Sequence, residues 1–98
     1  MAISDAFMIV EVDIQGNDEV IVKGRAYLDI LVGDVLYGEN VNEELIEQCS
    51  KFVVEKITSY GKETPILSSV MTGNLLLKGV DTFRLSDCKM LHKCINDD

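Results

Sequence analysis

Short runs of alternating apolar and polar residues recur along the chain, and turn-forming residues separate them. The apolar positions of the run 7–14 lie two residues apart, at Met8, Val10, Val12 and Ile14. This period of two is typical of a half-buried β-strand whose inner face carries these four side chains. The run 19–26 has the same period, with Lys23 and Arg25 on its polar face. Because residues 15–18 are dense in turn formers, we expect the two runs to form a hairpin.

The second half of the chain repeats this pattern. Residues 52–60 mix β-branched and aromatic side chains with charges, and residues 71–80 carry three consecutive leucines between two glycines. Both compositions favour strands. Between them, Gly61 can adopt a positive φ and Pro65 holds the preceding residue in extended geometry, so the chain is expected to reverse there.

One glycine and two further stretches complete the expected order of elements. Gly24 lies inside a strand pattern, where glycine usually marks a β-bulge or a close approach of two backbones. Residues 35–37 form a short apolar run after a Gly-Asp pair and predict another strand. Residues 88–91 predict a last strand, and the polar residues 92–98 predict a frayed end.

The segment 39–49 has helical spacing. Its apolar residues recur with a period close to that of an α-helix, at Val41, Leu45, Ile46 and Cys49. With Asn40 and Asn42 as candidate N-caps, this spacing predicts one short helix near residues 42–49. The same segment carries four acidic side chains, Glu39, Glu43, Glu44 and Glu47. They form either a solvated face or a platform for a partner.

The run 51–91, together with two earlier motifs, carries a resemblance to a known family. Residues 19–25 read Glu-Val-Ile-Val-Lys-Gly-Arg, and residues 30–36 place Gly-Asp ahead of the next strand. This order resembles the β-barrel domain 2 of translational GTPases such as elongation factor Tu, over roughly residues 6–91. The resemblance implies an all-β fold, a closed six-stranded antiparallel barrel of Greek-key type that stands alone without the GTPase domain.

The sequence departs from that family at several turns. Asp29 and Cys88 stand where the family tends to have glycine, and residues 68–71 replace a turn rich in Gly and Asp. The helical segment near residues 42–49 has no counterpart in the family pattern. We therefore expect these loops to be shaped differently from those of the family.

Length and composition bound the class of protein. The 98 residues, with 47% hydrophobic and 27% charged side chains, suit one globular domain over residues 1–98. No segment approaches the roughly 20 consecutive apolar residues that a membrane span needs. A secretory signal is not expected either, because no cationic region precedes the partly apolar start. The prediction is a cytoplasmic protein without a membrane partner.

Net charge limits the partners. Seventeen acidic and nine basic residues leave a formal charge of -8. This balance disfavours nucleic acid, whose binders usually present clustered Lys and Arg side chains to the phosphates. A basic protein partner suits the charge better. The plainer alternative is that the charge serves solubility alone.

Candidate chemistry is sparse. The three cysteines, Cys49, Cys88 and Cys94, are odd in number and lack a Cys-x-x-Cys pair, so reduced thiols are expected. His92 lies between two of them, but neither a metal site nor a thiol enzyme with His92 as its base is the preferred interpretation. The sequence lacks a phosphate-binding loop, so no nucleotide and no cofactor is expected.

These observations predict a non-catalytic binding module that holds a protein partner, and we expect no enzyme activity. The acidic candidates for binding are Glu39, Glu43, Glu44 and Glu47, and the candidates on the barrel wall are Lys23, Arg25 and Lys56. One alternative is an inhibitor of immunity or antitoxin type that covers a basic nuclease. Another is a translation accessory factor that contacts tRNA or the ribosome through the three basic residues.

Overall fold

The computed structural model describes residues 2–38, 50–80 and 82–95. Over these residues the fold is all-β. The elements are β1 (Ala2–Ile14), β2 (Glu19–Ala26), β3 (Ile30–Leu31), β4 (Val35–Tyr37), β5 (Lys51–Ser59), β6 (Lys62–Thr64), β7 (Ile66–Leu67), β8 (Thr72–Gly79), the 3-10 helix η2 (Thr82–Asp87) and β9 (Met90–Ile95). The short helix predicted near residues 42–49 lies outside the described residues.

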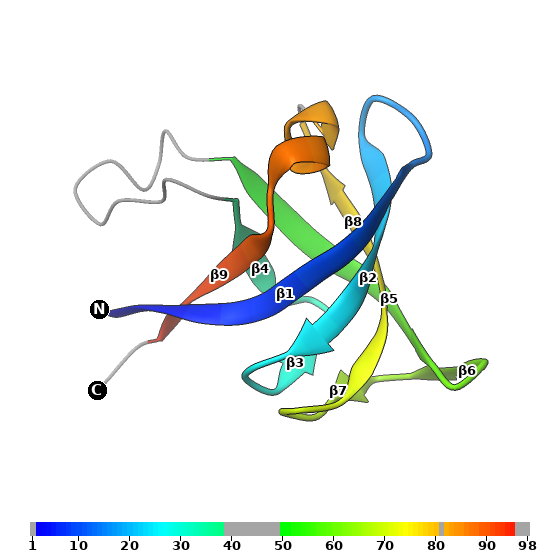
Figure 1. Ribbon diagram of the computed structural model, residues 1–98, viewed down its shortest axis with the longest axis vertical. Helices are drawn as coiled ribbons and strands as arrows, with labels where there is room; N and C mark the ends of the chain where they lie inside the picture. Colours follow the sequence, from blue (N-terminus) through cyan, green and yellow to red (C-terminus); the bar gives the residue numbers. More distant parts are fainter. Residues whose placement is uncertain (1, 39–49, 81, 96–98) are drawn as a thin grey trace.

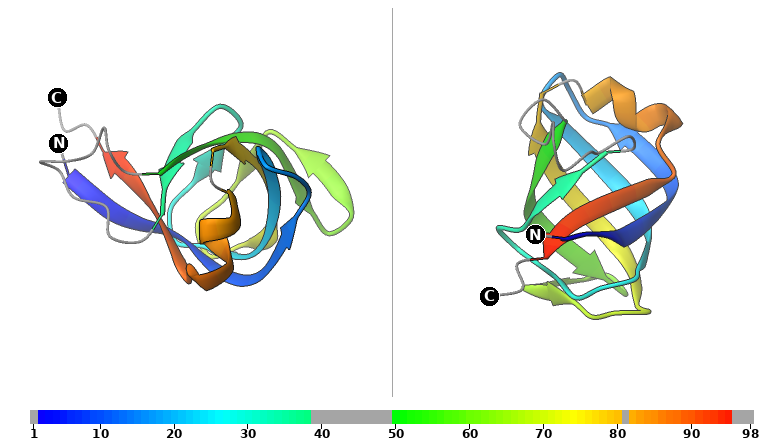
Figure 2. Two further views of the ribbon diagram at one scale, coloured as in Figure 1. Left: turned by 90° about the horizontal axis from the view of Figure 1, so that it is seen from above. Right: turned by 90° about the vertical axis from the view of Figure 1, so that its left-hand side faces the viewer.

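Six strands form a ring of hydrogen-bonded neighbours in the order β4, β9, β1, β2, β8 and β5, and β5 pairs again with β4. The strand pairings around the ring are antiparallel. The left-hand view of Figure 2 looks into this ring, with η2 over its opening. β6 extends the sheet from β5, while β3 and β7 form a separate two-stranded sheet. Between β4 and β9 the ring closes through one residue pair, Tyr37 and His92.

β2 and β8 confirm the pattern read from the sequence. The expected hairpin of β1 and β2 is present, and β2 lies between β1 and β8. The inner face of β2 is buried along its length, at Val20, Val22, Gly24 and Ala26. Lys23 and Arg25 lie on the exposed face, as predicted. Leu75 and Leu77 of β8 join the same core cluster.

β1 corrects the predicted inner face. Val10 and Ile14 were expected inside, but they are 66% and 41% exposed, whereas Phe7 and Ile9 are buried. The pairing register of β1 shifts once between Asp5 and Phe7 against β9, and once between Ile9 and Glu11 against β2. Because a bulge inserts one extra residue, it moves the following side chains to the opposite face. Between the two bulges Phe7 and Ile9 therefore point inward.

β9 corrects the predicted chain end. The last strand begins at Met90, two residues after Cys88, and it continues to Ile95. Residues 92–95, which the polar composition predicted to be frayed, pair with residues 2–5 of β1. Figure 1 shows these two strands side by side at one edge of the molecule. The pairing partner is distant in sequence, so local composition could not predict this pairing.

The two glycines singled out in the sequence have the expected roles. A Cβ atom at Gly24 would overlap the backbone carbonyl of Met8 in β1, which confirms a close approach of the two strands. Gly61 has a φ of 76° in the loop between β5 and β6, which confirms the predicted reversal. Asp29, in contrast, does not have a positive φ. Its carboxylate accepts a hydrogen bond from the Ser69 N–H at 2.8 Å.

η2 was not predicted from the sequence. Its first residue, Thr82, is buried, and its hydroxyl donates to the Gly16 carbonyl oxygen at 2.8 Å. Leu85 is also buried and belongs to the core cluster. η2 thus ties the end of the ring to the loop between β1 and β2.

Candidate functional site

The predicted basic residues lie on the outer surface of the ring. Lys23 and Arg25 belong to β2, Lys56 belongs to β5, and all three are exposed. β8 lies between these two strands, which places β2 and β5 roughly 10 Å apart. The three cations therefore share one wall but do not form one cluster.

These cations differ in their immediate electrostatic surroundings. Lys56 Nζ lies 3.2 Å from Glu63 Oε1. Lys23 stands opposite Glu11 in the register of β1 and β2. Arg25 is different, because its cross-strand neighbours Met8 and Thr72 are uncharged. No ion pair joins Arg25 to another residue within the described ranges.

The predicted acidic platform, Glu39, Glu43, Glu44 and Glu47, lies outside the described residues. Seven of the seventeen acidic residues, and none of the nine basic ones, lie outside the described ranges. The described part of the chain is therefore close to neutral. Most of the surplus negative charge belongs to residues 39–47, 81 and 97–98.

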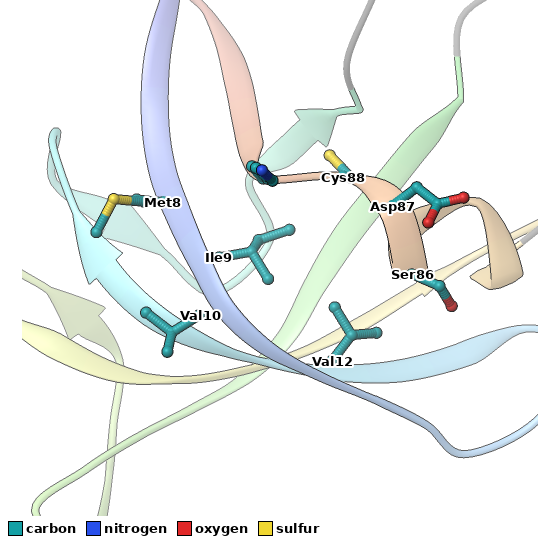
Figure 3. A pocket seen from close by; sticks show the side chains of 8 residues that line it. Met8, Ile9, Val10, Val12, Ser86, Asp87 and Cys88 are labelled. Carbon is teal, nitrogen blue, oxygen red and sulfur yellow. The ribbon is translucent and has the colours of Figure 1, made fainter.

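An open pocket of about 530 Å³ lies between β1 and the end of η2 with the two residues that follow it (Figure 3). One wall is apolar and comes from β1, with Met8, Ile9, Val10 and Val12; the other wall is formed by Ser86, Asp87, Cys88 and Lys89. The Ile9 N–H donates to the Lys89 carbonyl oxygen at 2.8 Å and joins the two walls. The pocket thus lies at the bulge after Ile9, where the pairing of β1 with β9 ends.

Cys88 and His92 have structural partners. Cys88 is only 7% exposed, and its Sγ lies 3.2 Å from the Met90 carbonyl oxygen. His92 Nδ1 lies 3.1 Å from Asp5 Oδ1, and His92 does not line the pocket. Within residues 2–38, 50–80 and 82–95, no three His, Cys, Asp or Glu side chains form a group that could hold a metal ion.

A half-buried ion pair was missed in the sequence. Lys93 Nζ lies 2.8 Å from Asp34 Oδ2, and the two side chains are 24% and 21% exposed. The same carboxylate oxygen accepts the Leu31 N–H at 2.9 Å. This contact ties β9 to the turn between β3 and β4. Asp34 belongs to the Gly-Asp motif before β4, which the sequence made visible. No pattern in the sequence indicated Lys93 as its partner.

Two exposed residues with unusual backbone geometry were also missed. Among the described residues other than glycine, Tyr60 and Val70 have positive φ angles, of 52° and 67°. Tyr60 precedes Gly61 in the two-residue loop of the β5–β6 hairpin, where two successive positive φ angles are typical of a type I′ turn. Val70 lies in the turn 68–71. Residues 68–71 contain no glycine where the resemblance implies a turn rich in Gly and Asp, and this difference was the available signal for an unusual turn.

No helix among the described residues is long and apolar enough to cross a membrane. No family model matches the chain, and no curated protein and no solved structure matches it either. Function therefore has to be inferred from the fold, charge and surface of this chain itself.

Proposed function

We propose that this chain is a cytoplasmic, non-catalytic binding module that holds a basic protein partner. In the same proposal its fold is a closed six-stranded Greek-key barrel of the elongation factor Tu domain 2 type. The ring of six antiparallel strands supports this fold. The positions of the motifs support it as well, since Gly24 and Arg25 lie near the end of β2 while Gly33 and Asp34 precede β4.

The uneven distribution of charge carries the proposal for the partner. The described part of the chain is nearly neutral, whereas the segment 39–47 contains four glutamates and no basic residue. A concentrated charge of one sign attracts a partner of the opposite sign over a distance and raises the rate of encounter. A basic protein surface is the partner that this arrangement fits best.

An inhibitor of a basic nuclease, of immunity or antitoxin type, would be one form of this function. A role beside tRNA or the ribosome would depend instead on the wall that carries Lys23, Arg25 and Lys56. Glu63 is paired with Lys56, and Glu11 stands opposite Lys23. These carboxylates reduce the attraction of that wall for phosphates, so we prefer the protein partner.

The test changes Glu43, Glu44 and Glu47 together to lysine. A matched control changes three acidic residues outside that segment, Asp13, Asp18 and Glu55, to lysine, so that both variants have the same net charge. Basic proteins retained from an extract of the native cell would be purified one by one. Their association rates with the wild type and both variants would then be measured across a salt series.

For a true partner we expect the segment variant to associate at least about tenfold more slowly at low salt. The control should change the rate by less than about threefold. The difference should disappear toward 1 M salt, where the Debye length falls to about 3 Å. Equal effects of both variants would mean that the segment acts only through its contribution to the net charge. Rates that depend neither on salt nor on substitution would contradict the proposal.

A further inference from the structure

The turn between β7 and β8 holds Val70 in a strained conformation and exposes its side chain. Val70 has a φ of 67° and is 63% exposed. The Met71 N–H donates to the Ser68 carbonyl oxygen at 3.0 Å, which closes the turn 68–71. Glycine or asparagine is usual at such a position, and a β-branched residue there is an outlier. Strain of this kind persists only where the surrounding structure imposes it, and it is concentrated at functional sites.

Four hydrogen bonds impose this geometry from residues 26–29. The Val70 N–H donates to the Ala26 carbonyl oxygen at 2.8 Å, and the Ala26 N–H donates to the Met71 carbonyl oxygen at 2.9 Å. The Ser69 N–H donates to Asp29 Oδ1 at 2.8 Å, and the Ser69 hydroxyl donates to the Tyr27 carbonyl oxygen at 3.0 Å. The turn is therefore fixed against the end of β2 before any partner binds. Figure 1 shows the end of β2 and the start of β8 at the same end of the molecule.

Exposed apolar side chains lie on the chain segments next to Arg25. Tyr27 is 40% exposed and Met71 is 37% exposed. The Tyr27 hydroxyl lies 3.5 Å from Met8 Sδ, so its ring extends over β1 beside the position of Arg25. Arg25 is exposed and makes no ion pair with a described residue. We call Arg25, Tyr27, Val70 and Met71 the Val70 surface.

We propose that the Val70 surface binds an acidic protein segment that presents a carboxylate to Arg25 and an apolar side chain to Tyr27 and Val70. A guanidinium recognises a carboxylate through two parallel hydrogen bonds, and Arg and Tyr are frequent energetic centres of protein interfaces. The cross-strand neighbours of Arg25 are uncharged, and the Asp29 carboxylate is already bonded to the Ser69 N–H. This inference goes beyond the proposed function, since the partner has the opposite charge and the surface excludes residues 39–49.

The test uses a phage-displayed library of random 12-residue peptides, selected on the wild-type protein. We expect enriched peptides in which Asp or Glu lies next to an aromatic or aliphatic residue. The dissociation constant of an enriched peptide would be measured by fluorescence anisotropy. Arg25→Glu should weaken binding at least about tenfold, as expected for loss of a charge-assisted pair. Lys62→Glu is the matched control, because it makes the same charge change at an exposed position of β6, and it should change the constant less than about twofold.

A second variant separates function from stability. Asparagine tolerates positive φ, so Val70→Asn should raise the melting temperature by about 4 °C. The same substitution should weaken binding of the peptide at least about fivefold. Tyr60→Asn changes the other exposed positive-φ residue and should leave peptide binding unchanged. The proposal would be overturned if the selection enriched basic peptides or no peptides at all. It would also be overturned if both Arg25→Glu and Val70→Asn left peptide binding unchanged. Binding of a single-stranded 20-nucleotide RNA that is lost in Arg25→Glu would also overturn it and assign the surface to nucleic acid.

Discussion

β1 and β2 pair with each other, yet only β2 keeps one face inward along its whole length. In β2 every second residue from Val20 to Ala26 is buried. In β1 Phe7 and Ile9 are buried, and after the bulge Val12 packs against the core instead. A period of two therefore identifies a strand, but it predicts the inner face only where the pairing register is unbroken.

The glycine of β2 and the bulge of β1 belong together. Ile9 stands opposite Gly24 and Glu11 stands opposite Lys23, so the extra residue of β1 follows directly after the glycine's partner. A side chain at Gly24 would overlap the Met8 carbonyl oxygen. The missing side chain on β2 thus lets β1 approach closely at the place where it bends.

The largest effect is expected from Gly24→Ala, which would break this close approach. The added Cβ meets backbone atoms of Met8, which cannot rotate away, so we expect a loss of at least about 3 kcal/mol in the free energy of unfolding. Urea denaturation would measure it. In the control Gly16→Ala, the nearest atom to the added Cβ is Asp18 Oδ1 at 3.9 Å, and a change within about 0.5 kcal/mol is expected. Equal stability of both variants would contradict the close packing of β1 on β2.

Two neighbouring alanine substitutions test which face of β1 is buried at the bulge. Ile9→Ala removes a buried side chain and should cost about 3 kcal/mol, because it leaves a cavity in the core. Val10→Ala removes a side chain that is 66% exposed and should cost less than about 0.5 kcal/mol. The simple alternation of the sequence predicts the reverse order. Thermal or urea unfolding of the two variants therefore decides which face of β1 is inside.

A smaller effect is expected at β9, the other neighbour of β1. Lys93→Met removes the partner of Asp34 from a half-buried ion pair and should cost about 1–2 kcal/mol. Lys56→Met breaks the pair with Glu63, whose side chains are 53% and 68% exposed, and should cost less than about 0.5 kcal/mol. Urea unfolding of both variants provides the comparison. Similar losses would mean that the position of Lys93 does not help to hold β9 on the ring.

The sequence predicted those parts of the fold in which local pattern decides the structure. The hairpin of β1 and β2, the burial pattern of β2, and the glycines at 24 and 61 were predicted correctly. The inner face of β1 and the extent of β9 were not, because they depend on register shifts and on pairing between the two ends of the chain. Those constraints arise only when distant segments meet.

The binding residues show the same limit. The exposure of Lys23 and Arg25 follows from strand alternation and was predictable, whereas Lys56 is exposed because the register of β5 against β8 shifts between Val54 and Lys56. The difference between Arg25 and the other two cations was not, because it depends on which residues stand opposite in neighbouring strands. The strain at Val70 was not predictable for a related reason, since residues 26–29, which are distant in sequence, hold the turn 68–71 in place.

The ring depends on the pairing of β4 with β9, and NMR measures this pairing directly. β4 pairs with β5 at three positions, including Leu36 with Phe52, but with β9 only at Tyr37 and His92. Residues paired across antiparallel strands have Cα atoms about 4.5–5.5 Å apart, so their backbone protons give nuclear Overhauser contacts. We predict such contacts both between Leu36 and Phe52 and between Tyr37 and His92. Contacts between β4 and β5 without any between β4 and β9 would show an open sheet and contradict the ring.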